Sequence, residues 1–188
     1  SAAIVTAHHK TPLRLIIREA HEVLKEVAKQ RAGRNALAIR LKKRSGGDRD
    51  FYCRWDEQNP FVENETVLQS FKLVMACAND DLSASLLYRL ADLRDAIFPF
   101  KEAIGGNLDK IRKLFDYEVG HSGKARNETQ RKFAGRLAGI CLSLNAGELR
   151  RSDKGEIIEE WFIPEAAVIA NFLASRRSSE DAREGVMK

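Results

Sequence analysis

Arginine, lysine and carboxamide side chains gather in residues 124–136, and their types suit contacts with a nucleic acid. Arg126 and Arg131 can each bond a guanine through two donors, as arginine does in the major groove. Asn127 and Gln130 carry the amide group that bonds adenine in the same way. The remaining cations of this stretch can hold phosphates, and they are Lys124, Lys132 and Arg136. A basic helix face that meets only solvent accounts for the same residues without a ligand.

Residues with catalytic spacing are few. The sequence contains no Walker loop, GxGxxG, HExxH or GxSxG motif. His121 and the nearby Arg126 are the types needed for metal-free ribonuclease chemistry, because imidazole moves protons and guanidinium stabilises a phosphorane-like charge. Asp116, Glu118 and Lys124 are the types of a metal-dependent nuclease, but they fall on a predicted helix and turn instead of paired strands. We therefore expect no catalytic residue, no metal site and no cofactor, and keep an enzyme as the alternative.

Charge alternates in blocks along the 188 residues, whose net charge is +5. Residues 1–50 hold twelve basic and five acidic residues, whereas residues 51–100 hold four and eight. Residues 101–150 hold ten basic and six acidic residues, and residues 151–188 hold six basic and eight acidic residues. A basic surface that faces a polyanion would give this pattern, and so would basic helix faces that pair with acidic ones inside the fold.

A β-hairpin is predicted over residues 37–55, because apolar side chains there recur with a period of two on both sides of a glycine turn at 45–48. Its tip and outer face carry the densest basic cluster of the chain, namely Arg40, Lys42, Lys43, Arg44 and Arg49. Such a hairpin can contact phosphates independently of base sequence. It can equally be an edge hairpin whose cations prevent pairing with other strands.

Apolar side chains at three- and four-residue spacing predict helices over 11–30, 66–78 and 81–97. Leu13 and Ile17 belong to the inward face of the first helix. The second and third helices lie in an acidic part of the chain, so we interpret them as a scaffold or a dimer surface.

The C-terminal half has the order of elements that a winged helix-turn-helix needs. These elements are a helix over 107–119 after the break at Gly105-Gly106, a turn over 120–123, a basic helix over 127–144 and a hairpin over 148–163 with Arg150 and Arg151 near its tip. Glutamates on the returning strand of this hairpin would repel phosphate unless they point away. That charge slightly favours a hairpin that faces protein.

The sequence thus predicts an α+β protein, mainly helical, with two β-hairpins around a helical core. We expect an N-terminal helix with the basic hairpin in 1–60, a helical scaffold in 61–106, the winged helix-turn-helix and a final helix in 107–175, and a flexible tail in 176–188. Residues 61–175 can also form one domain.

The leading hypothesis is a nucleic-acid-binding protein that contacts duplex DNA through the basic helix and the hairpin tips. The alternatives are an assembly protein that forms a homo-oligomer through its apolar helices, and an RNA-coating nucleoprotein that stacks bases on Tyr52 and Trp55. Three cysteines without metal or disulfide spacing indicate a reducing compartment. Because the sequence has neither a membrane-spanning run nor a signal-peptide core, we expect a cytoplasmic or nuclear chain that is not secreted.

Overall fold

A computed structural model describes residues 1–43, 47–81, 83–97, 104–121, 128–142, 150–151, 157–158 and 162–186. Within them the chain combines helices with a three-stranded sheet, which confirms the predicted α+β, mainly helical class. In chain order the elements are β1 (Ala2–Thr6), α1 (Leu13–Glu22), a π-helix η1 (Val23–Arg31), β2 (Ala36–Leu41), β3 (Arg49–Arg54), α2 (Val67–Asp81), α3 (Ala84–Ile97), α4 (Ile104–His121), α5 (Glu128–Cys141), β4 (Arg150–Arg151), β5 (Ile157–Ile158) and α6 (Glu165–Val186).

The sheet has the order β1-β2-β3. β2 and β3 form the predicted hairpin, in which Ile39 lies opposite Phe51. β1 is absent from the predicted elements and pairs in parallel with β2, with Thr6 opposite Leu41. The helical segment between these two strands is therefore the crossover of a βαβ unit.

The predicted helix over 11–30 changes its winding part way along. Within η1, the amide of Ala32 donates to the carbonyl of Val27, five residues earlier, at 2.8 Å. Val27 is buried, whereas α1 contains no buried residue. The predicted inward position of Leu13 and Ile17 is wrong, since these side chains are 70% and 50% exposed.

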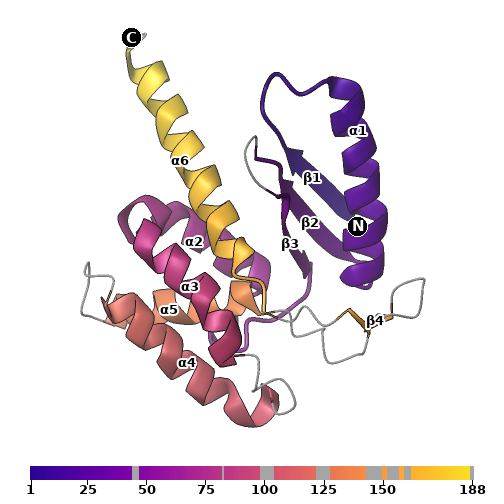
Figure 1. Cartoon of the computed structure of the whole chain (residues 1–188). Coiled ribbons are helices and arrows are strands. Elements are labelled where there is room, and N and C mark those ends of the chain that lie inside the picture. Colours follow the sequence, from indigo (N-terminus) through magenta and orange to yellow (C-terminus); the bar gives the residue numbers. More distant parts are fainter. Residues whose placement is uncertain are drawn as a thin grey trace.

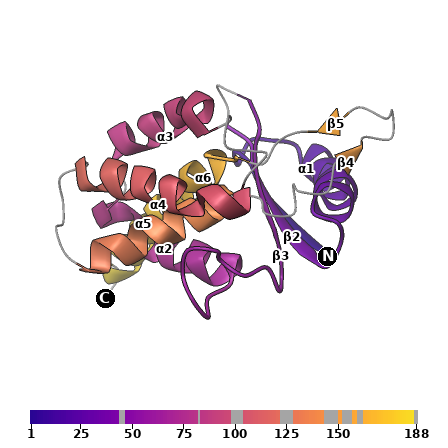
Figure 2. The ribbon, with the colours of Figure 1, turned by 90° about the horizontal axis from the view of Figure 1, so that it is seen from below.

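Helices cover both faces of the sheet (Figure 1). α1 and η1 lie on one face, and the helices from α2 to α6 gather on the other, as the view from below also shows (Figure 2). Alternation along β2 matches this arrangement, because Leu37 and Ile39 join the core with the helical body and Ala38 packs with η1. The rings of Phe51 on β3 and Phe71 on α2 stack with centroids 4.3 Å apart, which ties the sheet to the helical body.

Several helix ends differ from the predicted ones. α4 begins at Ile104, so Gly105 and Gly106, which were expected to break the chain, belong to the helix. α6 continues to Val186, so the backbone of residues 176–186, expected to be a flexible tail, is helical. α2 begins with reciprocal hydrogen bonds in which the Thr66 hydroxyl accepts from the Gln69 amide and the Gln69 side chain accepts from the Thr66 amide.

The predicted winged helix-turn-helix is described in part. α4 and α5 are the two helices, and β4 pairs antiparallel with β5 where the wing was predicted. The connection at 122–127 and the turn at 152–156 lie outside the described residues. The winged arrangement therefore stays a prediction.

Cys53 and Cys141 are buried free thiols, and Cys77 is half-buried. Burial raises the pKa of Cys53 to about 12, and it raises the pKa of Cys141 as well. Among the helices of the described residues, none is both long enough and apolar enough to cross a membrane.

Candidate nucleic-acid interface

A basic pocket opens where β1 and β2 end and α1 begins. It has a volume of about 260 Å³ and is lined by His8, Lys10, Thr11, Lys42 and Lys43; we call it the basic pocket. Because β1 and β2 are parallel, their carboxyl ends meet at the same edge of the sheet. Ligands of open sheets with parallel strands bind at this edge.

Backbone hydrogen bonds hold the two walls of the basic pocket together. The Lys42 amide donates to the Thr6 carbonyl at 2.8 Å, so the backbone just after β2 stays beside the end of β1. The Thr11 amide donates to the His8 carbonyl at 2.8 Å and closes the turn before α1. These bonds bring residues 8–11 next to residues 42–43, about thirty positions away in the sequence.

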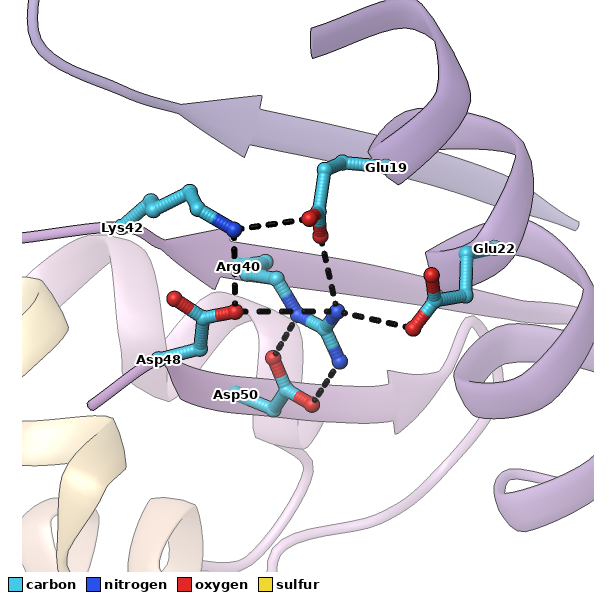
Figure 3. A network of polar contacts seen from close by, with 6 residues as sticks. All are labelled: Glu19, Glu22, Arg40, Lys42, Asp48 and Asp50. Atoms are coloured by element: carbon cyan, nitrogen blue, oxygen red, sulfur yellow. Dashed lines mark hydrogen bonds and ion pairs between the residues drawn. The ribbon is translucent and has the colours of Figure 1, made fainter. Parts of the chain in front are cut away.

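Arg40 is the centre of an ion-pair network beneath α1 (Figure 3). Its guanidinium binds Asp50 through two parallel bonds, Nε to Oδ1 at 2.7 Å and Nη2 to Oδ2 at 2.8 Å. Its Nη1 also lies 3.2 Å from Glu19 and 3.5 Å from Glu22, both on α1. Asp50 raises the pKa of Arg40 through the short bonds between them. With its side chain only 11% exposed, Arg40 connects α1 to the sheet and does not lie on the outer face where it was expected.

Lys42 belongs to both the network and the basic pocket. Its ammonium lies 2.7 Å from Glu19 Oε1 and 3.3 Å from Asp48 Oδ2. The hydrogen bond from Lys42 lowers the pKa of Glu19, and Glu19 in turn raises the pKa of Lys42. The positive charge predicted to contact phosphate is thus already shared with two carboxylates.

Lys10 and Lys43 are the exposed cations of the basic pocket. Within the described ranges, neither side chain has an ion-pair partner. Arg49 is half-buried on β3, and Arg44 lies outside the described residues. Of the predicted hairpin cluster, Lys43 is therefore the residue that the structure leaves available to an anion.

α5 is packed against α2, α4 and α6, so its basic residues can meet a ligand only on the side that these helices leave open. A side chain at Gly139 would overlap the buried amide of Asn59, and one at Gly135 would touch Val62 Cγ2 at 3.2 Å. The described residues of α5 that remain exposed are Arg131 and Lys132, near its start.

Arg136, predicted to approach a nucleic acid, binds Glu65 instead. Its Nε lies 2.9 Å from Glu65 Oε1 and its Nη2 lies 2.9 Å from Oε2. The Ser70 hydroxyl donates to the same carboxylate at 2.7 Å. Burial opposes ionisation of Glu65, but the bonds from Arg136 and Ser70 outweigh it, so the pKa of Glu65 is lowered. Arg136 connects α5 to the segment before α2 and offers no unpaired charge.

The other predicted contacts cannot be placed as side chains. Lys124, Arg126 and Asn127 lie outside the described residues, and for Gln130, Arg150 and Arg151 the structure describes the backbone alone. Of the two aromatic residues proposed for base stacking, Tyr52 is buried against η1, whereas Trp55 is 41% exposed.

His8, Lys10 and Thr11 are not among the predicted site residues, because β1, which places them beside β2, is not among the predicted elements. A signal for that strand exists: the short apolar run from Ala2 to Val5 is followed by a polar turn and a Thr-Pro helix start, which is the order of a βα unit. No cluster of three or more potential metal-binding side chains occurs in the described part of the chain.

Comparison with known proteins gives one result. Residues 1–38 match the family model described as Cas10/Cmr2, second palm domain. The match covers β1, α1, η1 and the start of β2, and so includes the first wall of the basic pocket. No curated protein and no solved structure matches the chain. The match is limited to this N-terminal segment of the 188-residue chain.

Proposed function

We propose that this chain binds nucleic acid and that a phosphate group of the strand enters the basic pocket. The observation that carries the proposal is the convergence of Lys10, Lys42 and Lys43 on one cavity at the carboxyl ends of two parallel strands. Phosphate contacts of this kind supply sequence-independent affinity.

The start of α1 adds to the attraction for an anion. α1 begins next to the basic pocket, and no side chain caps its first turn. The first amides of a helix lack partners within the helix, and the helix dipole is positive at this end. Backbone donors and lysine charges would therefore act on the same phosphate.

A more specific form of this proposal is that the nucleic acid is duplex DNA. The close packing of α5 leaves Arg131 and Lys132 as its described residues that can approach a duplex. Base reading would then be confined to the first turns of α5, while the hairpin lysine Lys43 holds backbone phosphate.

The test measures binding of labelled duplex DNA and single-stranded RNA by fluorescence anisotropy over a salt series. We expect Lys43→Ala to weaken binding to every sequence and to lower the slope of log K against log salt by about 1. The matched control is Lys72→Ala, which removes an exposed lysine from α2, and we expect it to leave affinity unchanged. Absence of binding by the unmodified chain at low salt would refute the function. Equal losses in the two variants would refute the site.

A second candidate function is assembly with protein, and it is favoured by the surface of α1. Leu13, Leu15 and Ile17 are exposed on α1, and Ile4 is exposed on the edge strand β1. Leu13 and Ile17 are four residues apart and share one face of α1, and exposed aliphatic residues on one face mark an interaction surface. Analytical ultracentrifugation over a range of concentrations tests for a homo-oligomer, which Ile17→Glu should dissociate.

A further inference from the structure

One exposed face of α4 carries two cations and two aromatic rings in a row. Lys110, Lys113, Tyr117 and His121 follow each other at spacings of three, four and four residues, and all four are exposed. Such spacing places side chains on one face of a helix, here over roughly 16 Å of its length. The buried residues of α4, Ile111 among them, point into the core on another side.

Tyr117 and His121 form a tilted pair of neighbouring rings at the end of this row. Their ring centroids are 3.9 Å apart, with 35° between the ring planes. His121 Nδ1 lies 2.8 Å from the Tyr117 carbonyl oxygen. A carbonyl can only accept, so Nδ1 carries the hydrogen of this bond. The bond fixes the histidine ring at the end of α4, while Tyr117 remains 59% exposed.

Further cations lie close to the end of α4. α4 and α5 pack together, and α5 begins at the end of the helical body where α4 finishes (Figure 2). The exposed Arg131 and Lys132 lie in the first turns of α5. Proteins that bind single strands combine this kind of positive surface with aromatic rings on which bases stack.

We infer that the exposed ring of Tyr117, supported by the His121 ring against it, is a platform on which an unpaired nucleobase stacks, with Lys113 and the α5 cations beside the phosphates of the strand. This inference rests on the general proposal that the chain binds nucleic acid, and it names a strand with unpaired bases as the partner in place of duplex DNA. A base within a duplex is already stacked on both faces and cannot use the platform. The two rings are held in position before binding, so stacking a base on them costs less conformational entropy.

A pair of aromatic side chains four residues apart can also serve only to stabilise the helix end. The experiment must therefore separate base stacking from helix stability. Tyr117→Ala removes the exposed ring, and Tyr117→Phe retains it. Tyr88→Ala is the matched control, because Tyr88 is 75% exposed on α3 and has no ring contact with the described residues.

Binding of each variant is measured by anisotropy with an oligo-uridine strand, an oligo-thymidine strand and a thymidine strand in which abasic sites replace most bases. We expect Tyr117→Ala to weaken binding to the first two strands by about 5- to 100-fold, the range for losing one stacked base. Tyr117→Phe and Tyr88→Ala should stay within about twofold of the unmodified chain. The abasic strand should bind the unmodified chain and Tyr117→Ala equally, and the salt slope should not change because no charge is removed.

The possible results separate this inference from the proposed function. If the unmodified chain binds no strand at low salt, the proposed function fails and the platform with it. If Lys43→Ala weakens binding while Tyr117→Ala does not, the proposed function stands and the platform is refuted. An equal loss of affinity for the abasic strand in Tyr117→Ala also refutes the platform, because that loss would reflect helix damage, which a thermal melt followed by circular dichroism would confirm.

Discussion

Glu19→Gln should change stability and nucleic-acid affinity in opposite directions. Glu19 accepts from Lys42 at 2.7 Å and from Arg40 at 3.2 Å. Glutamine keeps an acceptor oxygen but loses the charge, and a hydrogen bond between charged groups is about twice as strong as a neutral one. The substitution should therefore cost about 1–2 kcal/mol of unfolding free energy. In a chain of this size that lowers the melting temperature by roughly 2–8 °C.

The same substitution releases Lys42 toward the basic pocket. With Glu19 neutral, the Lys42 ammonium is left with Asp48, at 3.3 Å, as its acidic partner among the described residues. One further phosphate contact would steepen the slope of log K against log salt by about 0.7–0.9 and raise the affinity at low salt. Calorimetry measures the melting temperature, and anisotropy measures the binding.

Glu22→Gln is the control for this prediction. Glu22 lies on the same helix, 3.5 Å from Arg40, but its side chain is 54% exposed, and the carboxylates that Lys42 contacts in the described residues are Glu19 and Asp48. We expect a stability change below about 1 kcal/mol and no change in the salt slope. If Glu19→Gln lowers affinity together with stability, Lys42 is structural and the competition between Glu19 and phosphate is refuted.

Other outcomes follow from the packing of α5 and from the carboxylate pKa values. Gly139→Ala should cost about 1–3 kcal/mol, because the new methyl group displaces the buried Asn59 amide, and urea unfolding measures it; a neutral result would show that this contact can relax. Arg136→Met should lower the unfolding free energy by about 2–3 kcal/mol, because the part-buried Glu65 carboxylate loses its cation and keeps only the Ser70 hydroxyl as a side-chain donor. The salt slope of binding should not change, and a shallower slope would show that Arg136 contacts phosphate. Because Glu19 and Glu65 have pKa values lowered from 4.5, their contribution to stability is present above about pH 4.5 and is lost as pH falls through the lowered values. Urea unfolding midpoints from pH 3 to 7 would show this loss. In Glu65→Gln the midpoint should fall less steeply below about pH 4.5 than in the unmodified chain.

Local patterns were sufficient to predict most helices and the β2–β3 hairpin. Leu37, Ile39 and Leu41 alternate with small or polar residues, and the stripe at Leu86, Leu90 and Leu93 is buried as expected. β1 was not predicted, because two of its five residues are alanines and the burial of its side chains does not alternate. The π-helical winding of η1 has no local sequence signature, so the inward face of α1 was also assigned wrongly.

The candidate site was harder to predict because it depends on which charges meet. Arg40 and Glu19 are 21 residues apart, and they approach only because β1 pairs with β2 and carries α1 across the sheet. Arg136 and Glu65, 71 residues apart, meet through the packing of α5 against α2. Composition identifies basic residues, but it cannot show which of them are neutralised in the fold.

The ion-pair network around Arg40 holds α1 on the sheet, so binding in the basic pocket should affect how firmly α1 is attached. α1 has no buried residue, and a second cavity of about 160 Å³ lies against it, lined in part by Val5, Leu15 and Ile16. Because hydrophobic packing beneath α1 is sparse, the bonds from Glu19 to Arg40 and Lys42 carry much of its attachment to the sheet. A phosphate that draws Lys42 away from Glu19 would weaken that attachment. Binding in the basic pocket should therefore accelerate hydrogen exchange of the α1 amides around Glu19, while the first amides of α1, which donate to the phosphate, should exchange more slowly.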